Sequence, residues 1–276
     1  MNELTILMYH YVRPIAGSRF PEIKGLELEA FKRQLDYLNE RYNIVTTEQV
    51  INAVLGRSGL PRDACWLTFD DGYKDHFEFV LPELLERNLH GAFFPPRAAV
   101  ESNVVLDVNA IHHILSSEID IKELVRKLNQ LCVLNGITET ELTSLYQKFG
   151  IADRFDDAST IYFKRMLQHV LPESTRNSIT EQLFNDCVGI KQSDFSNELY
   201  MSVDEVKMLA NSGMYVGSHG SMHYWLDRIS TEEQKQDIAQ SLEFLELIGV
   251  STKNWVMCYP YGAYNSDTLL LLKNFG

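Results

Sequence analysis

Two adjacent carboxylates, Asp70 and Asp71, directly follow the apolar segment 64–69. A continuous apolar run of this length predicts a strand buried on both faces. Enzymes with α/β barrels place their catalytic groups at the carboxyl ends of such strands. Successive side chains point in different directions, so one aspartate can bind a cation while its neighbour faces a bound water. The alternative is a plain strand-to-loop turn, because Asp-Gly is an ordinary turn sequence.

Two histidines, His219 and His223, follow another predicted strand at 214–217. Imidazoles four residues apart converge on one cation if the residues between them form a helical turn. Alone, this spacing is weak evidence, since surface histidines often show it by chance. Together with Asp71 the pair supplies one carboxylate and two imidazoles, a donor set typical of hydrolytic zinc sites.

Two further segments carry groups that hydrolysis needs. Tyr261 lies in the segment 258–262, where a proline and a glycine fix a backbone that can aim an amide N–H into a pocket as an oxyanion donor. His10 follows the apolar segment 4–9, and the unperturbed histidine pKa of ~6.5 suits a general acid. Taken singly, these segments are better explained as a structural turn and a hydrogen-bonded core histidine.

Short apolar runs alternate with amphipathic stretches over residues 1–100 and again over 200–276, which predicts a mostly parallel sheet, open or closed into a barrel. Capping-box sequences mark the starts of several of the helices. Residues 101–199 contain helical patterns and no convincing strand, so we expect a helical insertion. The predicted strands are 4–9, 43–45, 64–69, 91–94, 214–217 and 255–259, and the capping boxes are Thr46–Gln49, Ser202–Glu205 and Ser230–Glu233.

The composition indicates which binding partners and which cellular compartment to expect. A net charge of -13 argues against nucleic acid and anionic membrane partners, since both reward basic patches. No segment approaches the roughly 20 apolar residues that span a bilayer. Four scattered cysteines without a CxxC pair fit a reducing compartment, and no secretory leader precedes the first apolar run. The expectation is a cytoplasmic protein.

Taken together, these segments resemble the NodB-homology polysaccharide deacetylases. The opening segment 7–12 is similar to the permuted branch of that family, which includes the poly-N-acetylglucosamine deacetylases. The resemblance covers about residues 1–100 and 200–276 and leaves out the segment between them. It rests on Thr68-Phe69-Asp70-Asp71-Gly72, on His219 with His223, and on Tyr259-Pro260-Tyr261-Gly262.

The resemblance implies an α/β fold, a distorted (β/α) barrel with its site at the carboxyl ends of the strands. It also implies a divalent metal, Zn first, with Co or Ni as alternatives. By position, Asp70 matches the general base and His10 the general acid of the permuted branch, and the backbone N–H of Tyr261 matches the oxyanion donor. The implied metal ligands are Asp71, His219 and His223.

Three departures from the family pattern stand out. Cys258 occupies the position of an arginine that orients the base in many members, although the permuted branch commonly lacks that arginine. The late motif that supplies the acid histidine in non-permuted members is absent, which places acid catalysis on His10. The barrel strand expected after the helix near Asn274 is also absent, so we expect a barrel that is incomplete or open at its C-terminal end.

The function that these residues and the resemblance predict is metal-dependent N-deacetylation of an N-acetylated sugar or glycan, releasing acetate. Two alternatives stay open. One is a related metal-dependent amidohydrolase that cleaves a non-sugar C–N bond, such as a cyclic imide or a formyl group. The other is a catalytically silent homologue that binds glycans.

Overall fold

A computed structural model describes residues 3–276. The chain divides into two compact units, described here one at a time. The first comprises residues 1–16, 25–104 and 196–276, and the second comprises residues 17–24 and 105–195. Every residue singled out for chemistry above belongs to the first unit.

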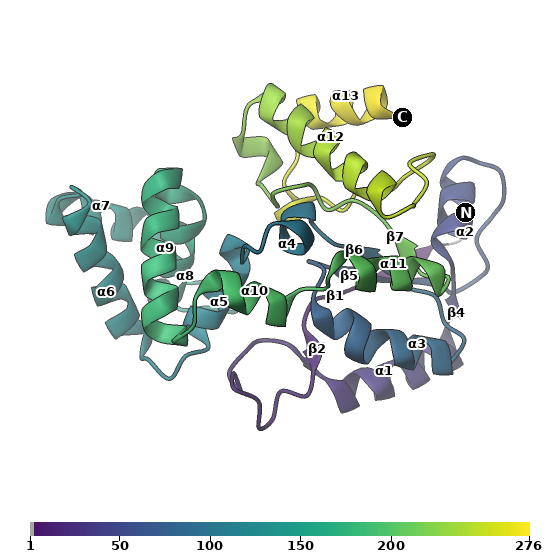
Figure 1. Ribbon diagram of the computed structural model, residues 1–276, viewed down its shortest axis with the longest axis horizontal. Helices are drawn as coiled ribbons and strands as arrows, with labels where there is room; N and C mark the ends of the chain where they lie inside the picture. The colour runs from purple at the N-terminus through teal and green to yellow at the C-terminus, as the bar shows by residue number, and fades with distance from the viewer. Residues whose placement is uncertain (1–2) are drawn as a thin grey trace. The chain divides into compact units, whose positions relative to one another are not determined.

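The first unit is built on a parallel sheet (Figure 1). Its strand order is β1-β5-β6-β7, and β4 also pairs with β5. The predicted mixed α/β fold with a parallel sheet is confirmed. The strand predicted at 255–259 is present only as an isolated parallel bridge between Ser218 and Met257. The strands are β1 (Leu4–Tyr9), β4 (Asn43–Ile44), β5 (Ala64–Asp70), β6 (Ala92–Phe94) and β7 (Tyr215–Val216), with β2 (Val12–Arg13) and β3 (Leu26–Glu27) as a separate pair.

Strand β5 is buried along its whole length because both of its faces are covered. Leu67 and Phe69 pack in one cluster with apolar side chains of the surrounding helices. Trp66, on the opposite face, belongs to a second cluster with Phe94 of β6. Alternation of side chains between two apolar environments explains why the sequence of this strand is continuously apolar.

Three helices of the first unit, α2, α11 and α12, begin at the predicted capping boxes. Capping boxes are present at Thr46, Ser202 and Ser230, each with the side chain accepting from the backbone amide three residues on. A five-residue π-helical segment, His76–Val80, precedes α3. The helices are α1 (Leu28–Arg41), α2 (Thr47–Val54), α3 (Leu81–Glu86), α4 (Arg97–Glu101), α11 (Val203–Asn211), α12 (Thr231–Leu247) and α13 (Ser266–Phe275).

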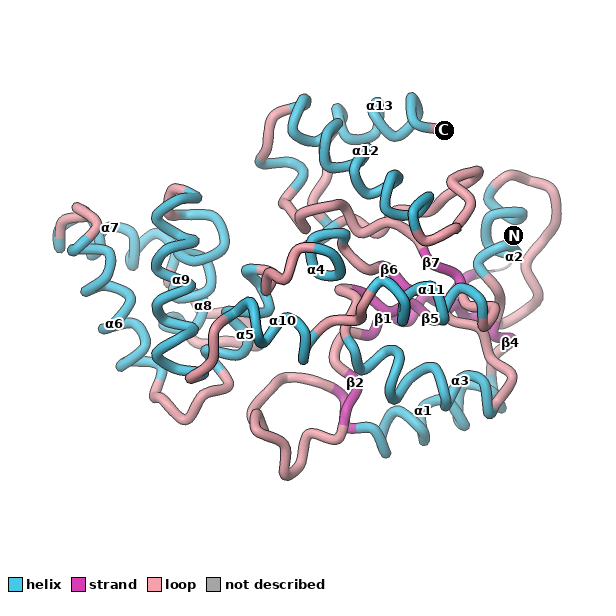
Figure 2. The backbone as a smooth tube through the Cα atoms, viewed as in Figure 1, coloured by secondary structure: helices cyan, strands magenta, loops and turns pink. Residues whose placement is uncertain are grey.

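The described residues of the second unit form helices joined by loops, with no strand among them (Figure 2). Its core includes Leu128 of α6, Phe163 of α8 and Phe184 of α9, all fully buried. That residues 101–199 are an insertion in the deacetylase domain stays a prediction. The helices here are α5 (Asp107–Leu115), α6 (Ile121–Leu134), α7 (Glu139–Phe149), α8 (Ala158–Arg165), α9 (Glu173–Val188) and the start of α10 (Gln192–Leu199).

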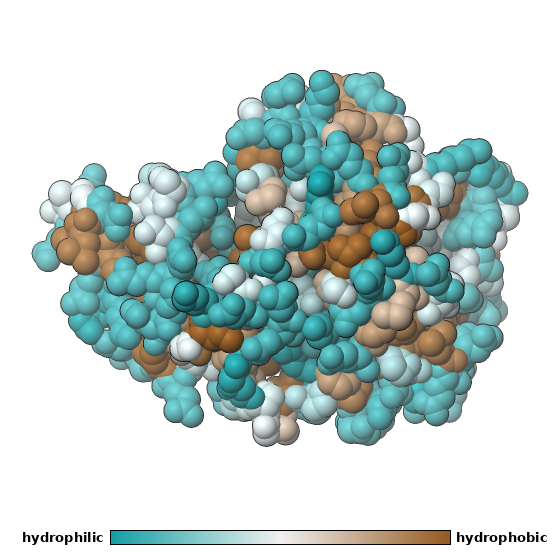
Figure 3. All heavy atoms as spheres, in the orientation of Figure 1, coloured by the Kyte–Doolittle hydropathy of each residue, from teal (hydrophilic) through white to brown (hydrophobic). Residues whose placement is uncertain are grey.

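The surface displayed in Figure 3 is mainly hydrophilic, with hydrophobic groups in separate areas. Over residues 3–276, none of the helices combines the length and the apolar character that crossing a bilayer requires.

The register of the sheet places two of the predicted catalytic residues at the carboxyl ends of its strands. In the parallel ladder, Tyr9 of β1 lies opposite Phe69 of β5. His10 and Asp70, the next residues along, therefore lie at the carboxyl ends of neighbouring strands. Asp70 in turn lies opposite Phe94, the last residue of β6. This is the edge at which α/β enzymes bind their ligands.

Candidate active site

Asp71, His219 and His223 meet in the interior of the first unit. Oδ1 of Asp71 lies 3.4 Å from Nε2 of His219 and 3.2 Å from Nε2 of His223. All three side chains are buried, and their ligand atoms lie within 4.8 Å of one another. A carboxylate oxygen and two imidazole nitrogens so arranged fit a divalent cation of the zinc type.

The tautomer of His219 suits a metal ligand. Nδ1 of His219 lies 2.8 Å from the backbone carbonyl oxygen of Cys258. Since a carbonyl oxygen only accepts, Nδ1 carries the proton of this hydrogen bond, and Nε2 is the nitrogen that would bind a cation beside Asp71 once its own proton is lost. Such outer hydrogen bonds orient metal-binding histidines and raise their basicity.

The two histidines converge by a route that differs from the predicted one. Residues 219–223 form an irregular loop rather than a helical turn. The carboxylate of Asp237, in α12, accepts hydrogen bonds from the backbone amides of Ser221 at 3.0 Å and Met222 at 2.7 Å. Gly220 has φ +71°, and a Cβ at this position would lie 2.6 Å from Oδ2 of Asp237. The buried carboxylate of Asp237 therefore shapes the loop that carries both imidazoles.

Three of the predicted site residues have left-handed backbones. The φ angles are +70° at Asp71, +58° at His223 and +58° at Tyr261. Outside glycine this conformation is uncommon, less so for aspartate and histidine than for tyrosine, and each instance costs on the order of 1–3 kcal/mol. Backbone strain of this kind concentrates at functional sites, where the surrounding structure holds it in place.

The second carboxylate oxygen of Asp71 is held by Tyr73. The Tyr73 hydroxyl donates to Oδ2 of Asp71 at 2.5 Å, which leaves Oδ1 facing the two histidines. The ring of Tyr73 stacks on Tyr11, with 4.2 Å between centroids. Tyr73 is fully buried, so this hydrogen bond fixes the direction in which Asp71 presents its other oxygen.

Charge distribution in the cluster follows from burial and proximity. Burial acts to raise the pKa of Asp71, but His223 and His219 outweigh it and hold that pKa well below its usual range. Burial acts to lower the pKa of His219, but the contacts with Asp71 and Cys258 hold it well above its usual range. The pKa of His223 is lowered by burial in spite of Asp71. Asp71 is therefore a carboxylate at neutral pH.

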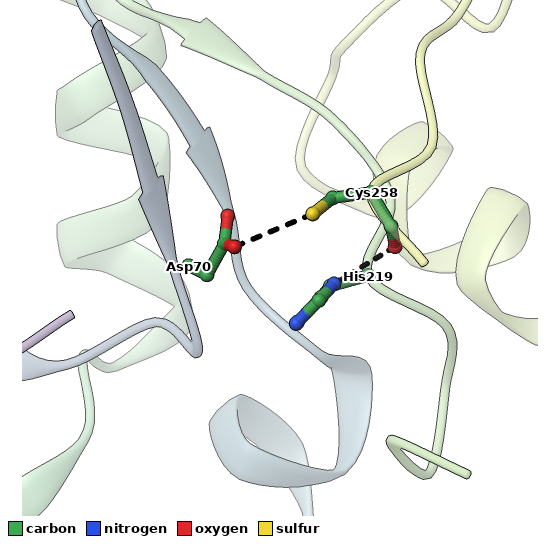
Figure 4. A group of neighbouring side chains, drawn as sticks. All are labelled: Asp70, His219 and Cys258. Atoms are coloured by element: carbon green, nitrogen blue, oxygen red, sulfur yellow. Dashed lines mark hydrogen bonds between the residues drawn. The ribbon is translucent and has the colours of Figure 1, made fainter. Parts of the chain in front are cut away.

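Asp70 ends β5 and lies close to His219 and Cys258 (Figure 4). It is only 2% exposed. Oδ2 of Asp70 accepts a hydrogen bond from the Cys258 thiol at 3.3 Å. Oδ1 accepts no hydrogen bond from any residue between 3 and 276. A buried carboxylate oxygen without a donor can accept a proton or a hydrogen bond from a bound molecule.

His10, the predicted acid, directly follows β1 and is half-buried. Its backbone carbonyl lies 2.9 Å from Nε2 of His76, which is fully buried. Asp75, the neighbour of His76 in the chain, accepts a hydrogen bond of 2.6 Å from the Arg13 guanidinium. Burial raises the pKa of Asp75 to about 6 although Arg13 opposes that shift. These residues fix the backbone at the end of β1, while the role of the His10 side chain stays a prediction.

Tyr261, the predicted oxyanion donor, is adjacent to the histidine cluster. Its ring centroid lies 4.7 Å from that of His223. The Tyr261 ring also stacks on the ring of Trp225, with 4.2 Å between centroids and 11° between planes. The left-handed backbone at Tyr261 lies within the turn Pro260–Gly262. The predicted donation from the Tyr261 N–H stays a prediction.

Sequence reasoning missed three residues of this site. Tyr73 follows the Asp70-Asp71-Gly72 segment at once, and a hydroxyl so close to a proposed ligand was a usable signal. Asp237 lies in the helix that begins at the Ser230–Glu233 capping box, and no local pattern marks it. Cys258 was noted only as a departure from the family, whereas the structure places its thiol against Asp70.

Comparison with known proteins bears on the family and the fold of the chain. Residues 150–276 match the family model described as "Polysaccharide deacetylase". No curated protein sequence matches the chain.

Several solved structures share the fold over 99–100% of this chain. They include the deacetylase PplD of Streptococcus pyogenes, solved with acetate (15% identity, 80% of that chain, TM-score 0.56). A de-N-acetylase from Aggregatibacter actinomycetemcomitans (17%, 85%, 0.57) and IcaB from Ammonifex degensii (19%, 82%, 0.57) are similar to the same extent. At these identities the likeness establishes the fold, which confirms the predicted (β/α)-barrel class.

The resemblance found in the sequence motifs is thus confirmed: this chain matches the polysaccharide deacetylase family over residues 150–276, and along its length it folds as the solved deacetylases do.

Proposed function

We propose that this protein is a metal-dependent N-deacetylase that releases acetate from an N-acetylated sugar or glycan. The observation that carries the proposal is the convergence of Asp71, His219 and His223 beside the buried carboxylate of Asp70. The family match and the shared fold with deacetylases support the substrate class.

The metal would be held by Oδ1 of Asp71 and by Nε2 of both histidines. The donor chemistry fits, because a carboxylate with two imidazoles leaves coordination positions for water and substrate. Zn is the first expectation, with Co or Ni as alternatives. When bound, such a cation activates water and polarises a carbonyl oxygen.

The remaining steps belong to residues of the chain. Asp70, with one buried oxygen free of hydrogen bonds, accepts the proton of the attacking water. The backbone N–H of Tyr261 stabilises the oxyanion, a contribution of roughly 3 kcal/mol for one such donor. His10 gives a proton to the departing amine, so that acetate and a free amino sugar leave the site.

Acetate release tests the proposal. The substrates are N-acetylated oligosaccharides, assayed with the apoprotein reloaded with Zn, Co or Ni. Asp70→Asn should lower kcat by roughly 10²–10⁴-fold, the usual contribution of a positioned general base, while metal affinity is retained. His223→Ala should lose metal binding at Asp71, His219 and His223, and should lose activity with it. Glu232→Gln, on the exposed side of α12, is the control and should behave as wild type.

The same assay separates the alternatives. Turnover of formyl or cyclic imide amides, with no acetate released from sugars, would identify a different amidohydrolase. Glycan binding with no turnover under any of the three metals would identify a silent homologue. Full deacetylase activity in Asp71→Ala would refute the site itself.

A further inference from the structure

A second group of potential metal ligands shares His219 with the first. It consists of Asp70, His219 and Cys258, whose ligand atoms also lie within 4.8 Å of one another. The three side chains come from the end of β5, the loop after β7 and the segment that bridges to Ser218 (Figure 4). No local sequence pattern connects them, because 188 residues separate Asp70 from Cys258.

The strongest sign of ligand binding in this group is Asp70 itself. It is 2% exposed, and its Oδ1 accepts no hydrogen bond from the part of the chain that the structure describes. A buried carboxylate oxygen without a hydrogen-bond donor destabilises the fold unless a ligand, an ion or a water molecule binds to it. Its other oxygen already contacts the Cys258 thiol, so the carboxylate points toward the sulfur.

The chemistry of the second group differs from that of the first. A thiolate is a soft ligand that selects thiophilic cations such as Zn²⁺ and Cd²⁺, whereas a carboxylate with two imidazoles accepts a broader range of metals. We propose that Asp70, His219 and Cys258 form a second binding site for a thiophilic divalent cation, mutually exclusive with the site at Asp71, His219 and His223.

Exclusivity follows from the shared imidazole. Nδ1 of His219 is bonded to the Cys258 carbonyl, so the ring offers a single lone pair, on Nε2. One lone pair serves one ion. Filling the second site therefore empties the first, and it also occupies Asp70. A cation in the second site would therefore inhibit the proposed deacetylase. That inhibition rests on the proposed function, whereas binding at the second site does not.

Cadmium titration tests the site directly, because a cadmium–thiolate bond produces a charge-transfer absorption band in the ultraviolet. The apoprotein should develop the band with one equivalent of Cd²⁺. Cys258→Ser should lose it and bind Cd²⁺ more weakly, by at least the ~10-fold that loss of an outer metal partner costs. Cys187→Ser is the matched control, since Cys187 is also a half-buried free cysteine, and should keep the band.

His223→Ala separates this proposal from the proposed function. That variant lacks a ligand of the first site but retains the second, so its Cd²⁺ band should persist, while His219→Ala should lose it. Folding of each variant is checked by circular dichroism. A wild-type protein that binds Cd²⁺ without the band, or a band that survives Cys258→Ser, overturns the second site and leaves the deacetylase proposal standing.

Discussion

His219 donates a hydrogen bond from Nδ1 to the backbone carbonyl oxygen of Cys258, 2.8 Å away. The bond joins the loop after β7 to the segment that follows α12, and it selects the tautomer that presents Nε2 to Asp71. Because the acceptor belongs to the backbone, substitution of the Cys258 side chain leaves this tautomer in place. The two candidate cation sites can therefore be separated by mutation.

A metal bound at Asp71, His219 and His223 should stabilise the native state by mass action. At a free metal concentration of 100 times Kd, the free energy of unfolding should rise by about 2.7 kcal/mol. Urea unfolding of the apoprotein with and without Zn²⁺ measures the increment. Asp71→Asn should reduce the increment markedly, because the buried oxygen that faces both histidines loses its charge. An undiminished increment in that variant would place the stabilising ion elsewhere.

Asp237 should matter to metal affinity although it is not a ligand. Its carboxylate accepts from the amides of Ser221 and Met222, and Asp237→Asn would turn an NH₂ group toward one of these donors. We expect the loop to shift and Zn²⁺ affinity to fall by roughly 10–100-fold, the usual effect of removing a residue that positions metal ligands through hydrogen bonds.

Isothermal titration calorimetry measures this loss. Glu232→Gln, in the first turn of the same helix, controls for general effects on α12. Equal affinities in Asp237→Asn and wild type would mean that the loop holds its shape without the carboxylate.

Much of this architecture could be predicted from the sequence because its causes are local. The buried strand β5 is a continuous apolar run, and the helices after Thr46, Ser202 and Ser230 begin at capping boxes that the structure contains. The position of Asp70 at the carboxyl end of β5 follows from the same run.

What the sequence does not reveal is long-range. Asp237 contacts a loop about fifteen residues earlier in the chain, and Cys258 contacts Asp70 across a separation of 188 residues. Spacing of four residues would bring His219 and His223 together in a helical turn. Gly220 and Asp237 instead impose a different path on the loop between them. Contacts of this kind depend on the finished fold rather than on periodicity.

Tyr73→Phe should loosen the metal site without emptying it. The lost hydroxyl donates to Oδ2 of Asp71, so the carboxylate would keep its charge but lose the contact that fixes its orientation. We expect metal affinity to fall by about 10-fold, with Asp71 still bound. Competition with a chelator of known affinity measures the change. Tyr11→Phe is the control: it removes a hydroxyl from the ring that stacks on Tyr73 and leaves the Tyr73 hydroxyl in place.

Buried His76 should make stability fall in mild acid. Its Nε2 donates to the His10 carbonyl, and burial lowers its pKa from 6.5 to about 4. A histidine whose pKa is depressed by folding contributes stability above its unfolded pKa and loses it as pH falls from 6.5 toward 4. Between pH 7 and pH 5 this amounts to about 2 kcal/mol.

Urea unfolding of the metal-free protein at both pH values provides the measurement. His76→Gln retains a donor for the His10 carbonyl but cannot titrate, so its loss of stability over the same interval should be smaller than that of wild type by about 2 kcal/mol. Other titrating groups, including His219 and His223, remain in both proteins and cancel in the comparison. Identical pH dependence in the two proteins would show that His76 stays neutral in the unfolded chain or gains a proton at no cost in the folded one.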